Sequence, residues 1–250
     1  MSVLKVSNLS KAFGGLQALA DLDFIVNSGE ILGLIGPNGS GKTTTINVLT
    51  QVLSPSTGEV MLDAHRLTAM KANQIVRCGL ARTFQNLRLF NGHSVLDNVR
   101  VSQTIHCPTL LSRLNALPMG PERVLRLEAQ ELVERFGLGK RMHALAGSLS
   151  YGEKKRLEIA RAMATRPKFI LLDEPAAGMN TLEINWLQSA IREIRASGVG
   201  ILLVEHHMKL VMDICDRILV LNFGKKIADG PPELIARDPA VIESYLGKAH

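Results

Sequence analysis

A short glycine-rich stretch constrains this chain more than any other feature of its sequence. It reads Gly36-Pro37-Asn38-Gly39-Ser40-Gly41-Lys42-Thr43-Thr44, which fits the pattern G-x-x-x-x-G-K-[ST] of a phosphate-binding loop. The apolar run 30–35 precedes it, and apolar residues recur at helical spacing after it, between 46 and 53. A strand, a glycine turn and a helix start direct several backbone N–H groups and the helix dipole at one point. The stretch therefore predicts a nucleotide site; the alternative is a glycine-rich turn with an exposed lysine.

Individual residues of this loop have predictable roles. Glycines let the backbone approach a phosphate closely and adopt dihedral angles that a β-carbon forbids. We expect Lys42 to reach the β- and γ-phosphates of a bound nucleotide. We expect the Thr43 hydroxyl to ligate Mg²⁺, while the loop from Gly36 to Thr44 holds the phosphates.

The hydrophobic pattern along the chain indicates an α/β nucleotide-binding core. A strand pattern occupies 2–35, 58–62, 169–172, 199–204 and a hairpin within 217–228. The runs 169–172 and 199–204 are continuously apolar, as expected for parallel strands that are covered on both faces. Helical patterns occupy about 86–165 and the C-terminal end. We therefore predict a core made of 1–85 and 166–250, split in sequence by a helical insertion at 86–165.

Composition and charge exclude several classes of protein. The chain has 250 residues, of which 46% are hydrophobic, and a net charge of +6 that is scattered along the sequence. A scattered charge favours a solvated surface over a nucleic-acid groove. Three cysteines without C-x-x-C spacing indicate a reducing compartment. No apolar run reaches the roughly 18–20 residues of a membrane helix, and no secretory signal is visible, so we expect a soluble cytosolic chain.

One stretch of the helical region allows two interpretations. Residues 107–121 are apolar and bounded by prolines. They form either an ordinary surface connection or part of a docking face. If the protein acts at a membrane, other subunits must span it.

Two carboxylates follow the apolar run 169–172. Asp173 and Glu174 stand where that predicted strand ends, and ligands of open α/β sheets bind outside the carboxyl ends of strands. Asp173 is suited to hold Mg²⁺, and Glu174 is suited to polarise the attacking water as general base. The alternative is that the strand ends in acids because it emerges into solvent. His206, at the end of the next apolar strand, is a candidate for sensing the γ-phosphate, or is an ordinary exposed histidine.

A second glycine-containing segment begins a basic amphipathic helix. In Leu149-Ser150-Tyr151-Gly152-Glu153, Ser150 is placed to cap the helix, and Glu153 is placed to complete a capping box. A helix N-terminus with a serine and a glycine is also an anion site. Both interpretations are compatible with the sequence.

In combination, these segments resemble the ATP-binding-cassette (ABC) ATPases. The phosphate loop is followed in the family's order by a glutamine after a strand (Arg82-Thr83-Phe84-Gln85-Asn86), the 149–153 segment, Leu171-Leu172-Asp173-Glu174-Pro175 and Glu205-His206. The resemblance covers essentially the whole chain. Tyr151, the runs 156–161 and 176–180, and the glycines of Lys11-Ala12-Phe13-Gly14-Gly15 are most similar to ATPase subunits of branched-chain amino-acid importers.

The sequence departs from the usual family pattern at several positions. The 149–153 segment corresponds to the signature segment of the family. Tyr151 replaces the usual first glycine of that signature, and Glu153 replaces a common glutamine. His207 and Asn180 stand where aspartate is frequent. Tyr151 and Asn180 recur in the importer group, so they agree with that assignment.

The resemblance implies a fold and a set of residue roles. The fold would be a P-loop (RecA-like) core with an N-terminal antiparallel β subdomain and an inserted all-helical subdomain. Phe13 would stack on adenine, and Gln85 would contact the metal or water and report to membrane subunits. Ser150 and Gly152 would bind the γ-phosphate of ATP held by a second, facing subunit. Asp173, Glu174 and His206 keep the roles given above.

The resemblance also implies an activity and partners. It implies an ATPase, with ATP and Mg²⁺ as cofactors, that drives an importer of branched-chain or related amino acids. The implied partners are a second copy or a paralogous ATPase subunit, integral-membrane permeases and, indirectly, an external binding protein, with no nucleic acid. The location would be the cytoplasmic face of the inner membrane.

Several alternatives stay open on the sequence alone. The cargo of such a transporter could instead be a lipid, a lipopolysaccharide, urea or another amide. ABC ATPases of DNA repair or translation typically add coiled coils, zinc modules or a second cassette. A phosphate-loop phosphotransferase would not need the 149–153 segment. A GTPase is disfavoured, because no Asn-Lys-x-Asp motif occurs.

Overall fold

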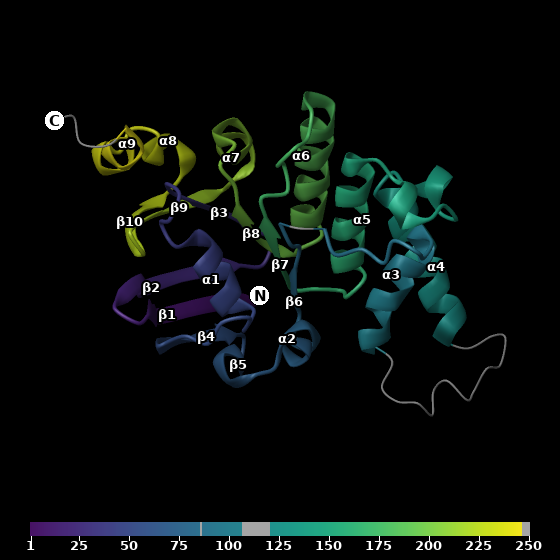
Figure 1. Cartoon of the computed structure of the whole chain (residues 1–250), viewed down its shortest axis with the longest axis horizontal. Coiled ribbons are helices and arrows are strands. Elements are labelled where there is room, and N and C mark those ends of the chain that lie inside the picture. Colours follow the sequence, from purple (N-terminus) through teal and green to yellow (C-terminus); the bar gives the residue numbers. More distant parts are fainter. Residues whose placement is uncertain (86, 107–120, 247–250) are drawn as a thin grey trace.

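Two β-sheets organise the structure, a computed structural model that describes residues 1–85, 87–106 and 121–246 (Figure 1). The smaller sheet is antiparallel and has the strand order β2-β1-β4-β5. Its strands are β1 (Val3–Phe13), β2 (Leu16–Asn27), β4 (Thr57–Leu62) and β5 (His65–Arg66).

The larger sheet positions the phosphate loop, Gln85, Asp173, Glu174 and His206, which lie at or just after the ends of its strands. Its order is β10-β9-β3-β8-β7-β6, and all pairs are parallel except the hairpin of β9 and β10. The strands are β3 (Ile31–Ile35), β6 (Leu80–Arg82), β7 (Phe169–Asp173), β8 (Gly200–Val204), β9 (Arg217–Asn222) and β10 (Lys225–Gly230). Because β3, β6, β7 and β8 run in one direction, the loops that follow them meet at one edge of the sheet.

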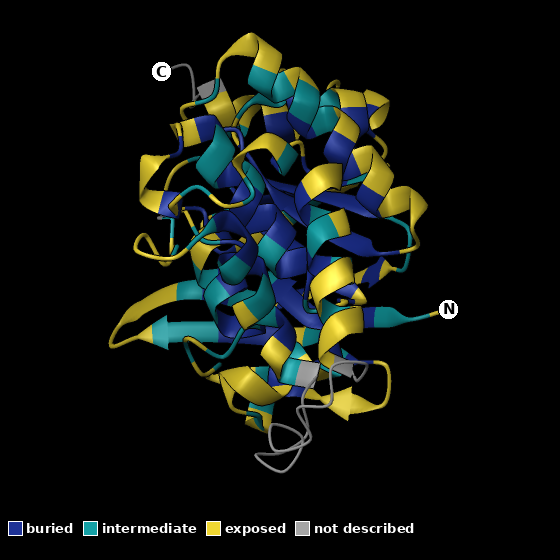
Figure 2. Cartoon of the chain, turned by 90° about the vertical axis from the view of Figure 1, so that its right-hand side faces the viewer, coloured by how far each residue is buried: buried dark blue, intermediate teal, exposed yellow. Residues whose placement is uncertain are grey.

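Apolar side chains cover both faces of this sheet. Along β3, Leu32 and Leu34 belong to the core shared with the small sheet, whereas Ile31 and Ile35 belong to the core on the opposite face. The other central strands alternate in the same way, and the buried residues of Figure 2 concentrate in these strands. Two buried faces explain why the strands are continuously apolar.

Helices pack on both faces and extend the molecule at one end. The α-helices are α1 (Lys42–Leu49), α2 (Ala72–Cys78), α3 (Val95–Gln103), α4 (Pro121–Arg135), α5 (Tyr151–Met163), α6 (Thr181–Ala196), α7 (Met208–Ile214), α8 (Pro232–Ile235) and α9 (Pro239–Leu246). Short 3-10 turns occupy Leu67–Ala69, Thr104–His106, Gly139–Arg141 and Ala146–Ser148. In Figure 1, α3, α4 and α5 lie together beyond α6, at the end of the molecule opposite α9.

The described elements agree with the predicted α/β class. The strand at 58–62, the buried strands at 169–172 and 199–204, the hairpin and the helical C-terminal end, which consists of α8 and α9, are confirmed. Helix α2 was not predicted, whereas β6 is the strand expected before Gln85. The 107–121 stretch lies outside the described residues except at its last residue. No helix in the described part of the chain is long and apolar enough to cross a bilayer.

Candidate nucleotide site

The phosphate loop connects β3 to α1, and its glycines adopt conformations that other residues avoid. Gly36, Gly39 and Gly41 have φ angles of 150°, 80° and 108°. A β-carbon at Gly36 would lie 2.1 Å from the carbonyl oxygen of Leu221, and one at Gly41 would lie 2.8 Å from that of Ala18. Glycine is therefore required at both positions by backbone angle and by space.

Lys42 lies within the curve of this loop. Its Nζ donates hydrogen bonds to the carbonyl oxygens of Gly36 (2.7 Å) and Pro37 (2.9 Å). Burial lowers the pKa of Lys42, and the charge of Glu174 opposes that shift. Thr43 is exposed and Thr44 half-buried. Within the described residues, no side chain caps the N-terminus of α1, so its first N–H groups are free to bind an anion.

Asp173 ends β7 and forms a buried ion pair. The Nη2 of Arg82 lies 3.0 Å from Asp173 Oδ2, and the two side chains are 9% and 5% exposed. The Nη1 of Arg82 donates to Asn47 Oδ1 (2.8 Å) on α1 and to Thr50 Oγ1 (3.1 Å) at the C-cap of that helix. Sequence reasoning selected Asp173 and missed Arg82. The signal was present, because a charged residue ends the apolar strand β6 beside β7.

Glu174 has two of the other predicted residues beside it. Gln85 Nε2 donates to Glu174 Oε2 at 3.0 Å, and His206 Nδ1 lies 3.9 Å from Glu174 Oε1. Glu174 has a positive φ of 48°, and its N–H donates to the carbonyl oxygen of Val204 (2.9 Å). Three segments far apart in sequence therefore converge on one carboxylate.

A second acid behind this group escaped the sequence analysis. Glu205 is 1% exposed and accepts hydrogen bonds from the backbone N–H groups of Ala176 (2.7 Å) and His206 (3.1 Å). Burial raises its pKa, while these hydrogen bonds act in the opposite direction. Glu205 thus links the backbone that follows β7, at Ala176, to the backbone that follows β8, at His206. A charged residue directly after a buried strand was the available signal.

The predicted capping box at α5 is confirmed. Ser150 Oγ accepts from the N–H of Glu153 (3.3 Å), and Glu153 Oε2 accepts from the N–H of Ser150 (2.8 Å). Ser150 is exposed, whereas Gly152 is buried against α6. A β-carbon at Gly152 would lie 2.0 Å from Glu183 Oε1, so a larger residue there would displace the Glu183 side chain. The structure thus brings Gly152 close to α6, and Figure 1 shows α5 on the side of α6 away from α1.

His207 shows how one departure from the family pattern is accommodated. Its Nδ1 accepts a hydrogen bond from the N–H of Leu210 (3.2 Å) and thereby caps α7. An aspartate at this position would cap the helix through its carboxylate in the same way. The histidine therefore keeps the capping function of the aspartate but not its negative charge.

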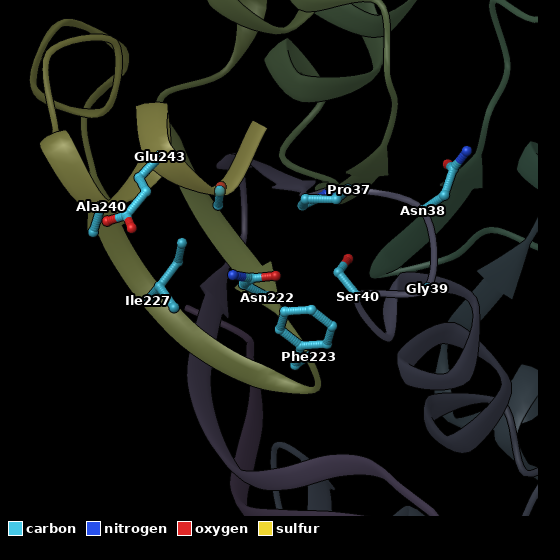
Figure 3. A pocket seen from close by; sticks show the side chains of 10 residues that line it. Pro37, Asn38, Gly39, Ser40, Asn222, Phe223, Ile227, Ala240 and Glu243 are labelled. Atoms are coloured by element: carbon cyan, nitrogen blue, oxygen red, sulfur yellow. The ribbon is translucent and has the colours of Figure 1, made fainter. Parts of the chain in front are cut away.

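Phe13, the predicted adenine platform, ends β1. It is 45% exposed, and Lys11 Nζ lies 5.0 Å from its ring centroid. A separate hollow of about 560 Å³ lies between the phosphate loop, the hairpin turn with Phe223, and α9 (Figure 3). Phe13 is not among the residues that line this hollow.

The residues predicted to ligate Mg²⁺ have the donor chemistry that this ion requires. A hydroxyl (Thr43), a side-chain amide (Gln85) and a carboxylate (Asp173) are hard oxygen donors. Among the described residues, Arg82 bonds only Oδ2 of Asp173, which leaves Oδ1 available. The set therefore fits a magnesium ion that shares its coordination with phosphate oxygens and water.

Comparisons with known proteins decide the family. The model of the family described as "ABC transporter" matches residues 19–177, more than half of the chain. This chain belongs to the ABC transporter ATP-binding family. A second family model, described as "Branched-chain amino acid ATP-binding cassette transporter", matches residues 225–250 of this ABC ATPase. The resemblance seen in the sequence is thereby confirmed, as are the fold class and the assignment as an ATPase.

Full-length relatives place this ABC ATPase more narrowly. It is 42% identical to the high-affinity branched-chain amino acid transport ATP-binding protein BraF of Pseudomonas aeruginosa, covering 99% of this chain and 98% of the relative. Identity is also 42% to LivG of Escherichia coli K12, with the same coverage. It is 34% to the lipopolysaccharide export system ATP-binding protein LptB of Haemophilus influenzae, again over 99% and 98%.

Solved structures agree with the fold. The ADP conformation of MJ1267, an ATP-binding cassette of an ABC transporter, has a TM-score of 0.85 to this structure and is 32% identical. The match covers 99% of this chain and 100% of that one. A nucleotide-free ATP-binding cassette from an ABC transporter gives a TM-score of 0.86 at the same identity.

Proposed function

We propose that this ABC ATPase powers the import of branched-chain or related amino acids from the cytoplasmic face of the inner membrane. The observation that carries the proposal is the 42% identity, over nearly the whole chain, with two proteins named for branched-chain amino acid transport. The match of residues 225–250 to the branched-chain transporter model supports the same cargo. Lipopolysaccharide export is the second candidate, favoured by the 34% identity to LptB.

The nucleotide chemistry follows from the residues at the sheet edge. ATP binds with its phosphates in the loop from Gly36 to Thr44, and Phe13 stacks on the adenine. Lys42 exchanges its two carbonyl partners for phosphate oxygens. The exchange is favourable because a charged acceptor then replaces a neutral one, so that both partners of the hydrogen bond are charged. Glu174 accepts the proton of the attacking water as general base. Gln85 and His206 hold that carboxylate in place.

Mg²⁺ completes the proposed site. Thr43, Gln85 and Asp173 would hold the ion, which neutralises charge on the phosphates when it is bound. Pro37, Asn38, Gly39 and Ser40 shape the loop around the β-phosphate.

Two copies, or one copy and a paralogous subunit, form the complete enzyme in this proposal. The free N–H groups of α1 bind phosphates from one side, and Ser150 and Gly152 of the facing subunit bind the γ-phosphate from the other. Support comes from the position of α5, which lies beyond α6 from α1 (Figure 1). Hydrolysis removes the shared ligand, and the dimer opens.

A groove beside Gln85 is the proposed contact for the permease subunits. It has a volume of about 150 Å³ and lies between the segment that follows β6 and helix α5. Phe84 and Arg88 line it, with the guanidinium carbon of Arg88 4.3 Å from the ring centroid of Phe84. Glu158 on α5 accepts a hydrogen bond from the N–H of Phe84 (2.9 Å). A permease element bound here would contact both the segment around Gln85 and helix α5.

Purification of the complex from native membranes tests the proposal. We expect integral-membrane subunits to copurify, and reconstituted vesicles to accumulate leucine, isoleucine or valine when ATP and an external binding protein are supplied. Copurification with lipopolysaccharide-export components, without amino-acid uptake, would refute the cargo assignment. A purified protein that lacks ATP hydrolysis in the complex would refute the enzymatic role.

A further inference from the structure

The two carboxylates at the end of β7 each have a basic group beside them. Arg82 forms an ion pair with Asp173 at 3.0 Å. The negative charge of Glu174 acts on Lys42 and opposes the effect of burial on its pKa. The formal charges of these four side chains cancel. These four side chains therefore leave no surplus negative charge of their own with which to attract a divalent cation.

Arg82 is held too firmly to be an incidental partner. Its Nη1 binds Asn47 on α1 and Thr50 at the C-cap of α1, while its Nη2 binds Asp173 on β7. The guanidinium is thus fixed between the helix that begins with the phosphate loop and the strand that carries the predicted metal ligand. A planar, multiply bonded guanidinium of this kind keeps its charge and its orientation. Its Nε is buried and has no hydrogen-bond partner among the described residues, so the two Nη groups make its hydrogen bonds, and its guanidinium carbon lies 4.8 Å from the ring centroid of Phe84.

The surroundings offer no substitute cation site. Among the residues that the structure describes, no group of three or more His, Cys, Asp or Glu side chains is arranged to hold a metal ion. Asp173 is the only one of the three predicted ligands that carries a charge. Whatever neutralises Asp173 consequently decides whether the site binds a free cation before a nucleotide does.

We propose that Arg82 is the positioning residue of the metal site: it neutralises Asp173 and orients it through Oδ2, so that Mg²⁺ enters only together with a triphosphate. This inference rests on the proposed function, which places ATP and Mg²⁺ at this site. A nucleoside triphosphate brings about four negative charges, which restores the attraction for the cation that the paired protein groups lack. Asp173 would hold the ion through Oδ1, because Oδ2 accepts the hydrogen bond of Arg82.

Nucleotide-free protein and Mn²⁺ provide the test, with the free Mn²⁺ signal followed by electron paramagnetic resonance. We expect the wild type to bind Mn²⁺ only after ATP is added. Arg82→Gln keeps a polar group near Asn47 but removes the charge, so it should bind Mn²⁺ without nucleotide, at least about tenfold more tightly than the wild type. Arg82→Lys should restore the wild-type behaviour, which a loss of packing alone would not explain.

Two further variants separate charge from structure. Arg217→Gln is the control, because Arg217 is likewise an ion-paired arginine, with Glu30 (2.9 Å) and Asp229 (2.7 Å) as its partners, but lies in a different part of the molecule. It should not gain Mn²⁺ binding. Asn47→Asp adds a negative charge beside an unaltered Arg82 and should gain binding, which keeps the test valid if Arg82→Gln does not fold.

Binding of a fluorescent ATP analogue in EDTA is measured on the same samples. A wild type that does not bind the analogue would contradict the proposed function itself. A wild type that binds the analogue and also binds Mn²⁺ without nucleotide would overturn only the role of Arg82. The same conclusion would follow if neither Arg82→Gln nor Asn47→Asp, correctly folded, gained Mn²⁺ binding.

Discussion

The N-termini of α1 and α5 are both proposed to bind phosphate, but their hydrogen bonds differ. At α1, Gly41 occupies the cap position with a φ of 108°, and within the described residues no side chain bonds the first N–H groups. At α5, Ser150 and Glu153 already satisfy each other's N–H groups in a capping box. The first terminus is free for a ligand, whereas the second is occupied by its own side chains.

This difference indicates an order of events. Phosphate binding at α1 breaks few protein hydrogen bonds, because Lys42 only exchanges its carbonyl acceptors. Binding at α5 must compete with the capping box or share its serine. The nucleotide should therefore bind first at the α1 terminus of one subunit, and α5 of the facing subunit should bind it afterwards. The comparison predicts that variants at the two termini affect different steps.

The largest effect is expected for Glu174→Gln, which leaves both termini unchanged. Removing the general base should reduce ATP turnover about 10²–10⁴-fold, while ATP binding persists. The variant should accumulate as an ATP-bound dimer, measured by size-exclusion chromatography with light scattering. Glu128→Gln is the control, since it breaks only an exposed ion pair with Arg166. Monomers of Glu174→Gln at saturating ATP and Mg²⁺ would contradict the dimer model.

Lys42→Ala changes the phosphate site at the N-terminus of α1. It removes charge-assisted hydrogen bonds worth about 1.5–3 kcal/mol each, so affinity for ATP should fall roughly 10- to 150-fold. Isothermal titration calorimetry without Mg²⁺ measures this directly. Lys168→Ala, which loses an exposed ion pair with Asp63 (2.6 Å), should bind ATP normally. Unchanged affinity in Lys42→Ala would mean that the loop is not the nucleotide site.

Ser150→Ala changes the N-terminus of α5. A second serine of the chain provides the control. Ser94 caps α3 in the same way, through a hydrogen bond from the N–H of Asp97 (3.0 Å). Both Ser150→Ala and Ser94→Ala should lose about 0.5–2 kcal/mol of stability in thermal or urea unfolding. Only Ser150→Ala should also lose the ATP-dependent dimer. Equal dimerisation of the two variants would leave Ser150 with a capping role alone.

Sequence alone predicted the loop, the two strand-end carboxylates and the capping box, because each depends on local spacing. It missed Arg82 and Glu205, because their roles depend on side chains that meet across strands. The pairing of β6 with β7 brings Arg82 to Asp173, and the Ala176 loop folds back onto Glu205. The interpretation of Ser150 stayed open for a related reason: a cap is internal to the helix, whereas an anion site requires a second subunit.

The smallest effect concerns the rigidity of the strand that leads to the first terminus. Cys215 packs behind β3, where a β-carbon on Gly33 would lie 2.9 Å from its Sγ. Burial, followed by the charges of Asp216 and Glu205, raises the pKa of Cys215 to about 12. Because only the thiolate reacts, about one thiol in ten thousand is reactive at pH 8.

Alkylation with iodoacetamide, mapped by mass spectrometry, should therefore leave Cys215 unmodified in the folded protein, while the half-buried Cys78 reacts. Because the raised pKa favours the thiol, the alkylation rate of Cys215 should rise about tenfold for each pH unit up to about pH 12. In denaturant, Cys215 should be alkylated as fast as an ordinary cysteine. If α1 and β3 are fully formed before nucleotide binds, ATP should not change this rate. A rate that changes with ATP would show that the first terminus, like the second, rearranges to receive its ligand.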